Sequence, residues 1–472
     1  MKMEESRPDV QNPIRHANSL QWKESQENKM LQSKCSGAPV VPERRGVKKE
    51  GTVWKAVASL LLSTAVLAPS SALAEPGEIT VWRHIGDLQA EMDTFASFVK
   101  GFNESQSDWK IKWEELPQKS YSDSINAAAL SNNLPCVIDV DGPLIPNYAW
   151  SGNLISLDDY MTPELRSEML PSTIGSYNGN VYGLGQFEAS LAIWARKSVL
   201  EKYGIRIPTG VDDPWSKDEF DAALATLKDS GEFETAIDLF TFYTHEWIPY
   251  AYSPFLESFG GDLIDRSTYL SAEGKLNGPE AIAWGEWWQN LFQSGLSDPK
   301  ATDDQAFIQG RAALAWIGNW YYPTLEKAWG DDLIYLPPPD LGTGPKVGAG
   351  SWQWAITKSC ANPDGAFAFI NYLLQPENIG KISNATGLIP GRSTAVPFSD
   401  SYKEGAPLAG ITAFPSNFAE IRPPTPAYSN ISVKFEEAAM AIANGANVQD
   451  TLDDAVTAID ADISANDGYG FE

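Results

Sequence analysis

The sequence predicts an α/β protein with two lobes, each built on a mainly parallel sheet flanked by helices. Three observations indicate this fold class. The chain has 472 residues, more than most single domains contain. Short apolar segments alternate with amphipathic ones near the start of the expected folded region, the order of a parallel sheet with right-handed crossovers. Hydrophobic residues make up 43% of a chain with 37 Gly and 32 Pro, which is typical of a globular protein rich in turns.

The first lobe begins with a regular order of strands and helices. We expect strands over residues 79–82, 109–113 and 136–140, separated by helices over residues 88–103 and 121–130. The strand segments are apolar or alternate with a period of two, whereas the helix segments carry apolar residues three or four positions apart. This β-α-β-α-β order predicts a parallel sheet, because parallel strands need a crossover between them.

The later part of the chain contains further helix signals. A turn at Asn178 leads into a strand and a second apolar run. Ser216 precedes Glu219 by three residues, the spacing of a capping box at a helix start. Apolar spacing over 448–463 predicts a final amphipathic helix. A helix is also expected over 281–292, with three Trp residues on one face that we expect in the core: Trp284, Trp287 and Trp288.

The segment 47–74 has the pattern of a secretory signal peptide. Lysines precede an apolar run over 56–68, and small residues follow, so we expect cleavage after Ala74. The upstream residues 1–46 are polar and show no periodicity, which suggests a leader absent from the mature protein and a translation start near Val47. Cys35 follows a lysine rather than the small residue of a lipoprotein signal. We therefore expect a periplasmic protein that is not a lipoprotein.

The expected mature chain is strongly acidic. Removal of residues 1–74 leaves 24 basic and 55 acidic residues, a net charge of about −31. Such a charge repels nucleic acid and anionic lipid, so we expect neither as a partner. A cationic ligand is one interpretation. We favour an acidic surface exposed to solvent, because the acidic residues are scattered along the chain.

Few cysteine and histidine residues are available for chemistry. Only Cys136 and Cys360 follow the signal peptide, and they form either one bridge or two buried thiols. We favour thiols, because Cys136 begins an apolar strand. His84 and His245 are the histidines of the mature chain, too few to suggest a zinc site or a Ser-His-Asp triad. We expect no cofactor.

Two polar residues follow predicted strands of the first lobe. In parallel sheets, ligands bind beyond the carboxyl ends of the strands, which makes His84 after the first strand and Asp141 after the third candidate ligand-binding residues. Each has a structural alternative: His84 as a helix cap and Asp141 as a turn former.

Four Trp residues lie in the segment 312–356. An indole ring offers a flat apolar face that suits the C–H face of a sugar, while polar side chains bind the hydroxyl groups. We place Trp320 and Trp352 in a ligand cleft. Trp316 and Trp354 alternate with apolar strand residues, and we expect both in the core.

The order of these elements resembles the extracellular solute-binding proteins of ABC importers, in particular the maltose- and trehalose-binding group. The resemblance runs from about Ile79 to the C-terminus. It rests on segments that include ITVWRH, DVDGPLIPNYAWSGNLISLDDYM, NVYGLGQFEASLAIWARK, FLESFGGDLID, AFIQGRAALAWIGNW, GAGSWQWAITKS and ATGLIPGRS. It implies a two-lobed periplasmic-binding-protein fold with a ligand cleft between the lobes and delivery of the ligand to a membrane permease.

The resemblance also implies a set of ligand-binding residues. Carried over by position, and added to His84, they are Asp141, Phe187, Glu188, Trp247, Asn319, Trp320, Gly350, Trp352 and Arg392. The family often has Asp at the position of Glu188. The aromatic residue that maltose-binding proteins carry near the C-terminal cleft is not evident here, and Tyr428 is the nearest candidate, which argues against a long maltodextrin.

The resemblance divides the chain into lobe I over 75–187 and 348–402, and lobe II over 188–347 and 403–472. It implies a monomer that binds a sugar or glycosylated polyol, such as a disaccharide or glucosylglycerol, and that performs no chemistry on it. Its partners would be the transmembrane subunits of an ABC permease. Two alternatives remain. One is a secreted glycosidase with Asp141 and Glu188 as its carboxylates. The other is a transport protein for glycerol phosphate, a sulfonated sugar or a polyamine.

Overall fold

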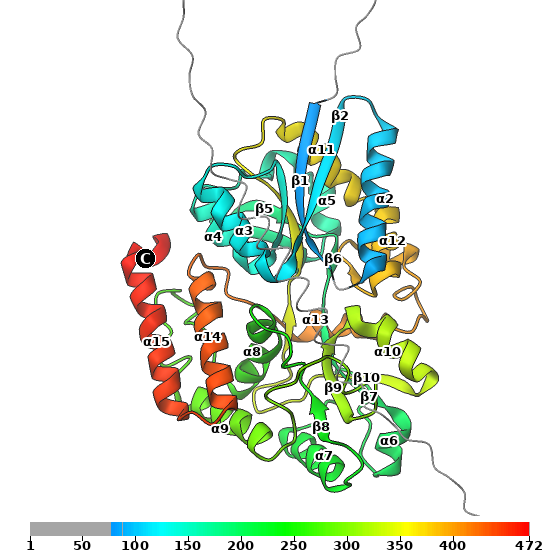
Figure 1. The fold of residues 1–472 in the computed structure, drawn as a ribbon, viewed down its shortest axis with the longest axis vertical. Helices are drawn as coiled ribbons and strands as arrows, with labels where there is room; N and C mark the ends of the chain where they lie inside the picture. The colour runs from blue at the N-terminus through cyan, green and yellow to red at the C-terminus, as the bar shows by residue number, and fades with distance from the viewer. Residues whose placement is uncertain (1–76, 87, 472) are drawn as a thin grey trace, which may run out of the picture. The chain divides into compact units, whose positions relative to one another are not determined.

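The computed structural model describes residues 77–86 and 88–471, and contains two main sheets (Figure 1). The expected leader 1–46 and signal peptide 47–74 lie outside the described residues. In spatial order, the six-stranded sheet consists of β2 (Trp109–Pro117), β1 (Gly77–Ile85), β3 (Val137–Asp141), β12 (Trp352–Ile356), β5 (Asn180–Leu184) and β4 (Ile174–Tyr177). The four-stranded sheet consists of β10 (Leu333–Leu336), β7 (Leu191–Arg196), β9 (Ala312–Gly318) and β8 (Thr235–Asp238). We call the parts around these sheets lobe I and lobe II.

Two short ribbons accompany the segments that connect the sheets. In one, β11 (Val347–Ala349) pairs in parallel with β14 (Ala419–Ile421). In the other, β6 (Phe187–Glu188) pairs antiparallel with β13 (Ile389–Pro390). The chain leaves the six-stranded sheet after β5, passes through β6 into β7, and returns from β11 to β12 through Gly350. The sheets are therefore joined by more than one chain crossing.

Helices surround both sheets. In chain order they are α2 (Gln89–Ser105), α3 (Gln118–Leu130), α4 (Ile145–Trp150), α5 (Pro163–Glu168), α6 (Lys197–Lys202), α7 (Lys217–Asp229), α8 (Trp247–Phe259), α9 (Pro279–Gln293), α10 (Tyr322–Trp329), α11 (Pro363–Leu373), α12 (Pro376–Thr386), α13 (Ala413–Phe418), α14 (Tyr428–Ala443) and α15 (Val448–Ala465). Helix α2 packs on β2, α11 and α12, whereas α14 packs on α8, α9 and α15. Among the described residues, no helix combines the length and the apolar character that a membrane span needs.

The expected β-α-β-α-β order is confirmed as β1, α2, β2, α3 and β3, with β1 between β2 and β3 and parallel to both. The expectation of mainly parallel sheets is wrong in detail, because both sheets are mixed. Strand β12 runs antiparallel to β3 and β5, and β7 runs antiparallel to β9 and β10. Strand β12 enters lobe I from lobe II, and such a long-range insertion leaves no mark in local periodicity.

Cys136 and Cys360 form a disulfide, which corrects the expectation of two buried thiols. Cys136 directly precedes β3, and Cys360 follows the antiparallel neighbour β12, so their Cα atoms lie 4.1 Å apart. The backbone nearby is also joined, because Thr357 N donates a hydrogen bond of 3.0 Å to the carbonyl of Cys136. The bridge fixes the register of the inserted strand against β3.

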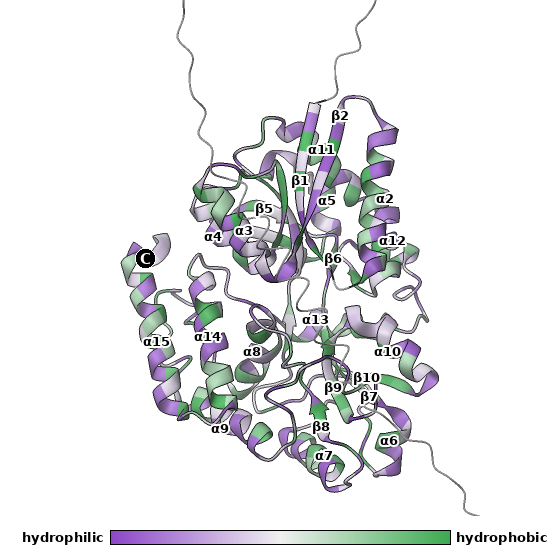
Figure 2. Cartoon of the chain, viewed as in Figure 1, coloured by the Kyte–Doolittle hydropathy of each residue, from purple (hydrophilic) through white to green (hydrophobic). Residues whose placement is uncertain are grey.

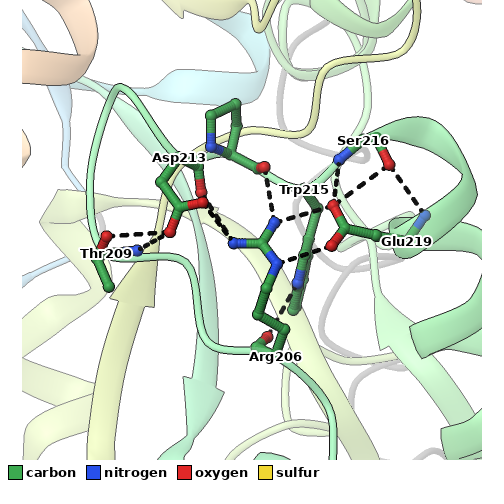
Figure 3. A network of polar contacts seen from close by, with 7 residues as sticks. Arg206, Thr209, Asp213, Trp215, Ser216 and Glu219 are labelled. Atoms are coloured by element: carbon green, nitrogen blue, oxygen red, sulfur yellow. Dashed lines mark hydrogen bonds and ion pairs between the residues drawn. The ribbon is translucent and has the colours of Figure 1, made fainter.

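The Trp residues occupy the positions expected from their spacing. Trp284, Trp287 and Trp288 on α9 are buried, as are Trp316 on β9 and Trp354 on β12. Trp320 and Trp352 keep partial exposure. Strand β9 is mostly hydrophobic, whereas the helices mix hydrophobic and hydrophilic residues (Figure 2). The capping box is confirmed at α7, where Ser216 and Glu219 bond each other's backbone N–H (Figure 3).

Candidate functional site

His84 and Asp141 lie near the carboxyl ends of β1 and β3, and Trp352 lies beside them at the amino end of the antiparallel strand β12. Asp141 ends β3, and its Cα partner on the antiparallel neighbour is Trp352, the first residue of β12. The imidazole of His84 stacks on the indole of Trp352, with ring centroids 3.6 Å apart and planes at 19°. Asp139 fixes this imidazole, because its Oδ2 lies 2.6 Å from His84 Nδ1 and its Oδ1 accepts from His84 N at 3.1 Å. The alternative of His84 as a helix cap is not realised, because the residue lies within β1 and α2 shows no side-chain cap.

Asp141 belongs to a cluster of three charged side chains, in which Asp141 and Arg422 are buried and Glu246 is partly exposed. The guanidinium of Arg422 donates to both carboxylate oxygens of Asp141, at 2.8 and 2.9 Å, and to Glu246 Oε2 at 2.7 Å. Arg422 is only 3% exposed. Burial lowers its pKa, but Asp141 and the neighbouring anionic groups outweigh that effect and raise the pKa above its ordinary value. Arg422 is therefore a permanent cation held between two carboxylates.

Glu246 directly precedes α8 and is held by α14. Its carboxylate accepts hydrogen bonds from Tyr428 Oη at 2.8 Å and from the Ser432 hydroxyl. Burial raises the pKa of Glu246, and Arg422 opposes that rise. Tyr428, the aromatic residue considered from the sequence, is thus fully buried and serves this cluster through its hydroxyl.

Lobe II contributes an aromatic surface from α8 and the turn after β9. Trp320 meets Trp247 edge to face with centroids 6.3 Å apart, and Tyr250 at 6.0 Å. A Cβ at Gly318 would collide with the Trp320 ring, so that glycine lets the indole lie flat over the backbone. The Arg422 guanidinium lies 5.1 Å from the centre of the Tyr250 ring and connects this surface to Asp141.

Phe187, Glu188 and Gly350 lie where the chain crosses between the sheets. Glu188 is fully buried, and its Oε1 accepts from Ala189 N at 2.7 Å and from Gly350 N at 3.0 Å. Burial raises the pKa of Glu188 to about 7, although the Ser172 side chain and the two backbone N–H groups lower it in part. Gly350 has φ of +89°, a conformation that favours glycine. Glu188 therefore connects the crossing from β5 to β7 with the crossing from β11 to β12 through a hydrogen bond.

A small cavity connects this crossing to the stacked pair of lobe I. Its volume is about 10 Å³, enough for about one water molecule, and its lining includes His84, Phe187, Trp352 and Arg83. Three of the residues nominated from the sequence thus face one space.

Asn319 and Arg392 are held by other protein groups. The Asn319 amide accepts from Ser190 N at 2.9 Å and donates to Gly387 O and Tyr402 Oη at 2.9 and 2.7 Å. Arg392 donates to Glu168 Oε2 at 2.5 Å and to Leu374 O at 3.0 Å. Neither makes a hydrogen bond to another nominated residue among those described. Their role in ligand binding stays a prediction.

Sequence reasoning missed Arg422, Glu246 and Tyr250. Arg422 follows the short segment Ala419–Ile421 and precedes two prolines, a pattern typical of a strand that ends in a loop. Glu246 stands one residue before the nominated Trp247, and Tyr250 lies one helical turn later. Because the partners of Arg422 are far away in the sequence, only the fold reveals the cluster.

Residues 97–409 match the model of the bacterial extracellular solute-binding protein family. A binding protein of Brucella abortus is 22% identical over 428 residues, which cover 86% of this chain and 98% of the relative. A lipoprotein of Streptomyces antibioticus is 23% identical over 355 residues, which cover 72% of this chain and 76% of that protein.

Solved structures share the fold. A solute-binding protein of Thermotoga lettingae, bound to α-D-tagatose, has a TM-score of 0.68 and 21% identity over 82% of this chain and 99% of its own. The cyclic α-maltosyl-1,6-maltose binding protein of Arthrobacter globiformis has a TM-score of 0.65 and 23% identity, covering 82% and 98% of the two chains. The family model spans more than half of the sequence, and the chain therefore belongs to the bacterial extracellular solute-binding proteins.

Proposed function

We propose that the protein binds a neutral sugar or glycosylated polyol between its two lobes and delivers it, chemically unchanged, to the transmembrane subunits of an ABC importer. One observation carries the proposal: the polar cluster of Asp141, Arg422 and Glu246 contacts aromatic residues of both lobes. Asp141 pairs with Trp352, and Arg422 contacts Tyr250, which packs against Trp247 and Trp320. Hydroxyl groups need hydrogen-bond partners once they are buried, and indole faces suit the apolar face of a sugar ring.

Two buried polar atoms near this cluster have no hydrogen-bond partner among the described residues. They are Arg422 Nε and Tyr250 Oη, on residues that contact each other. The first is a donor, and the second can donate or accept. A hydroxyl group has the same dual capacity, which supports a polyhydroxylated ligand. The ligands named for the two solved structures described above, α-D-tagatose and cyclic α-maltosyl-1,6-maltose, are also sugars.

Ligand delivery would work by a shift in population between open and closed arrangements. A ligand that contacts both lobes binds the closed arrangement better and favours it by that difference in affinity. We propose lobe boundaries at 75–187 with 348–402, and 188–347 with 403–472. The protein would be a periplasmic monomer, exported by cleavage of the segment 47–74 and not anchored by lipid, with no nucleic-acid partner.

Glycoside hydrolysis receives little support from the site. A hydrolase needs one carboxyl group to donate a proton and another free to attack or to activate water. Both oxygens of Asp141 are bound by Arg422, and Glu188 accepts hydrogen bonds from the backbone. An anionic ligand such as glycerol phosphate would meet the carboxylates of Asp141 and Glu246, with one guanidinium already shared between them.

The decisive experiment is a thermal-shift screen of the purified protein against glucose, trehalose, maltose, glucosylglycerol, glycerol phosphate and spermidine, because a ligand of the folded state raises its melting temperature. We expect one of the neutral glycosides to give the largest shift. Calorimetry should then show that Trp352→Ala weakens binding at least about tenfold, whereas Trp113→Ala, which removes a 41% exposed indole from β2, leaves it unchanged. A response to the phosphate or the polyamine alone, or turnover of a glycoside abolished by Asp141→Asn, would contradict the proposal.

A further inference from the structure

Arg422 forms a bridge between groups that belong to different lobes. Asp141 ends β3 of the six-stranded sheet, whereas Glu246 directly precedes α8, which packs on α9 and β11. Arg422 follows β14 and binds both carboxylates through its two terminal nitrogens. All three groups are the protein's own, so the bridge requires no ligand.

The position of Arg422 follows from the ribbon at the chain crossing. Strands β11 and β14 are parallel, with Ala349 opposite Ile421, so the next residues, Gly350 and Arg422, leave the ribbon at the same end. Gly350 in turn donates to Glu188 on the other crossing. Arg422 is thus placed beside the segments about which the two lobes would move.

The geometry makes the bridge a substantial interaction. Two N–H groups of one planar guanidinium bind the two oxygens of Asp141, which is the strongest common form of ion pair. Asp141 and Arg422 are 7% and 3% exposed, so water screens their attraction little. Breaking a buried pair by removing one partner is strongly destabilising, because the other charge is left uncompensated. Separating the lobes would also cost free energy, because it pulls the two buried charges apart, unless water reached both of them.

We propose that Arg422 is a positioning residue of the binding site: its bridge from Asp141 to Glu246 holds the two lobes together and sets how readily they open to a ligand. This inference rests on the proposed function only for the identity of the ligand. The bridge also occupies both oxygens of Asp141, so a ligand hydroxyl reaches that carboxylate only by sharing it with Arg422.

The test measures the distance between the lobes in buffer without any sugar. Dyes on Leu130→Cys in α3 and Asp229→Cys in α7 report that distance by single-molecule energy transfer, in the full chain with Cys35→Ser. Both positions are exposed, and Cys136 and Cys360 are already bonded to each other. We expect Arg422→Met to change the mean distance by at least roughly 2 Å relative to the parent protein, the scale of a domain rearrangement. It should also broaden the distribution.

Two further variants make the outcome decisive. If Arg422→Met fails to fold, the triple variant with Asp141→Asn and Glu246→Gln removes the bridge without leaving a buried charge unpaired. The matched control is Arg206→Met. Arg206 also binds two carboxylates, with both oxygens of Glu219 at 2.7 and 2.9 Å and Asp213 at 2.8 Å, but all three residues lie within lobe II (Figure 3).

The proposal stands if the bridge variants change the distance between the lobes and Arg206→Met does not. It is overturned if a folded bridge variant gives the parent distribution, or if the control shifts it equally. Because no sugar enters this measurement, a failure to bind any glycoside in the thermal-shift screen would count against the proposed function alone.

Discussion

Glu188 provides a sharp test of the electrostatics at the chain crossing. The residue is fully buried, and burial raises the pKa of its carboxyl from 4.5 to about 7. The substitution Glu188→Gln keeps the shape and keeps an oxygen that can accept from Ala189 N and Gly350 N. It removes only the ionisation.

The sign and size of the effect follow from proton linkage. Between pH 4.5 and about 7 the folded protein binds more protons at this site than the unfolded chain does, so the free energy of unfolding falls as the pH rises. One pKa unit corresponds to 1.36 kcal/mol, so the full shift lowers stability by about 3 kcal/mol above pH 7. Below pH 4.5 this contribution disappears. Glu188→Gln should therefore be more stable than the parent by up to about 3 kcal/mol at pH 8 and nearly equal to it at pH 4.5.

Urea unfolding followed by Trp fluorescence at pH 4.5, 6 and 8 measures the difference directly. Glu404→Gln is the control, because Glu404 is an exposed residue in a turn and should leave the pH profile unchanged. Equal pH dependence of the parent and Glu188→Gln would refute the assignment of a raised pKa to this carboxyl.

Three further variants test the disulfide, a helix cap and the backbone at the chain crossing. The disulfide joins residues 224 positions apart, and the lost chain entropy of the unfolded state stabilises the fold by about 5 kcal/mol. The double variant Cys136→Ala with Cys360→Ala should therefore lower the melting temperature measured by calorimetry. An unchanged melting temperature would show that the bridge does not stabilise the protein. Ser216→Ala removes the oxygen that accepts from Glu219 N and should cost about 1 kcal/mol in urea unfolding, and no loss would mean that the cap is dispensable. Gly350→Ala meets open space at its new Cβ but has φ of +89°, so it should destabilise by about 1 to 2 kcal/mol through the backbone alone, and a neutral result would contradict that strain.

Local patterns predicted the first five elements of lobe I and the burial of several Trp residues. Period-two and helical spacing located β1, α2, β2, α3 and β3, because each pattern is set by residues only a few positions apart. The capping box at Ser216 and the Trp face of α9 are equally local signals. The direction of β12 is not local, since Trp352 pairs with Asp141 across more than two hundred residues.

The candidate site also combines residues that local patterns identified with residues that only the fold reveals. Strand geometry nominated His84 and Asp141, and the structure brings both next to Trp352 or Arg422. Resemblance supplied Glu188, and the chemistry of indole rings supplied Trp320; the neighbours of both are equally distant in the sequence. Arg422 has no partner within reach along the chain, so no periodicity or motif could identify it before the fold was known.

The place of β12 in its sheet affects the order in which the protein can fold. Strand β12 lies between β3 and β5, so the six-stranded sheet has a gap until residues 352–356 have been synthesised. The four-stranded sheet needs only residues 191–336 and can form before residues 352–356 have been made. The six-stranded sheet would therefore stay incomplete for some time after β1, β3 and β5 have been synthesised. Lobe I therefore completes its sheet only after every strand of the four-stranded sheet has been made.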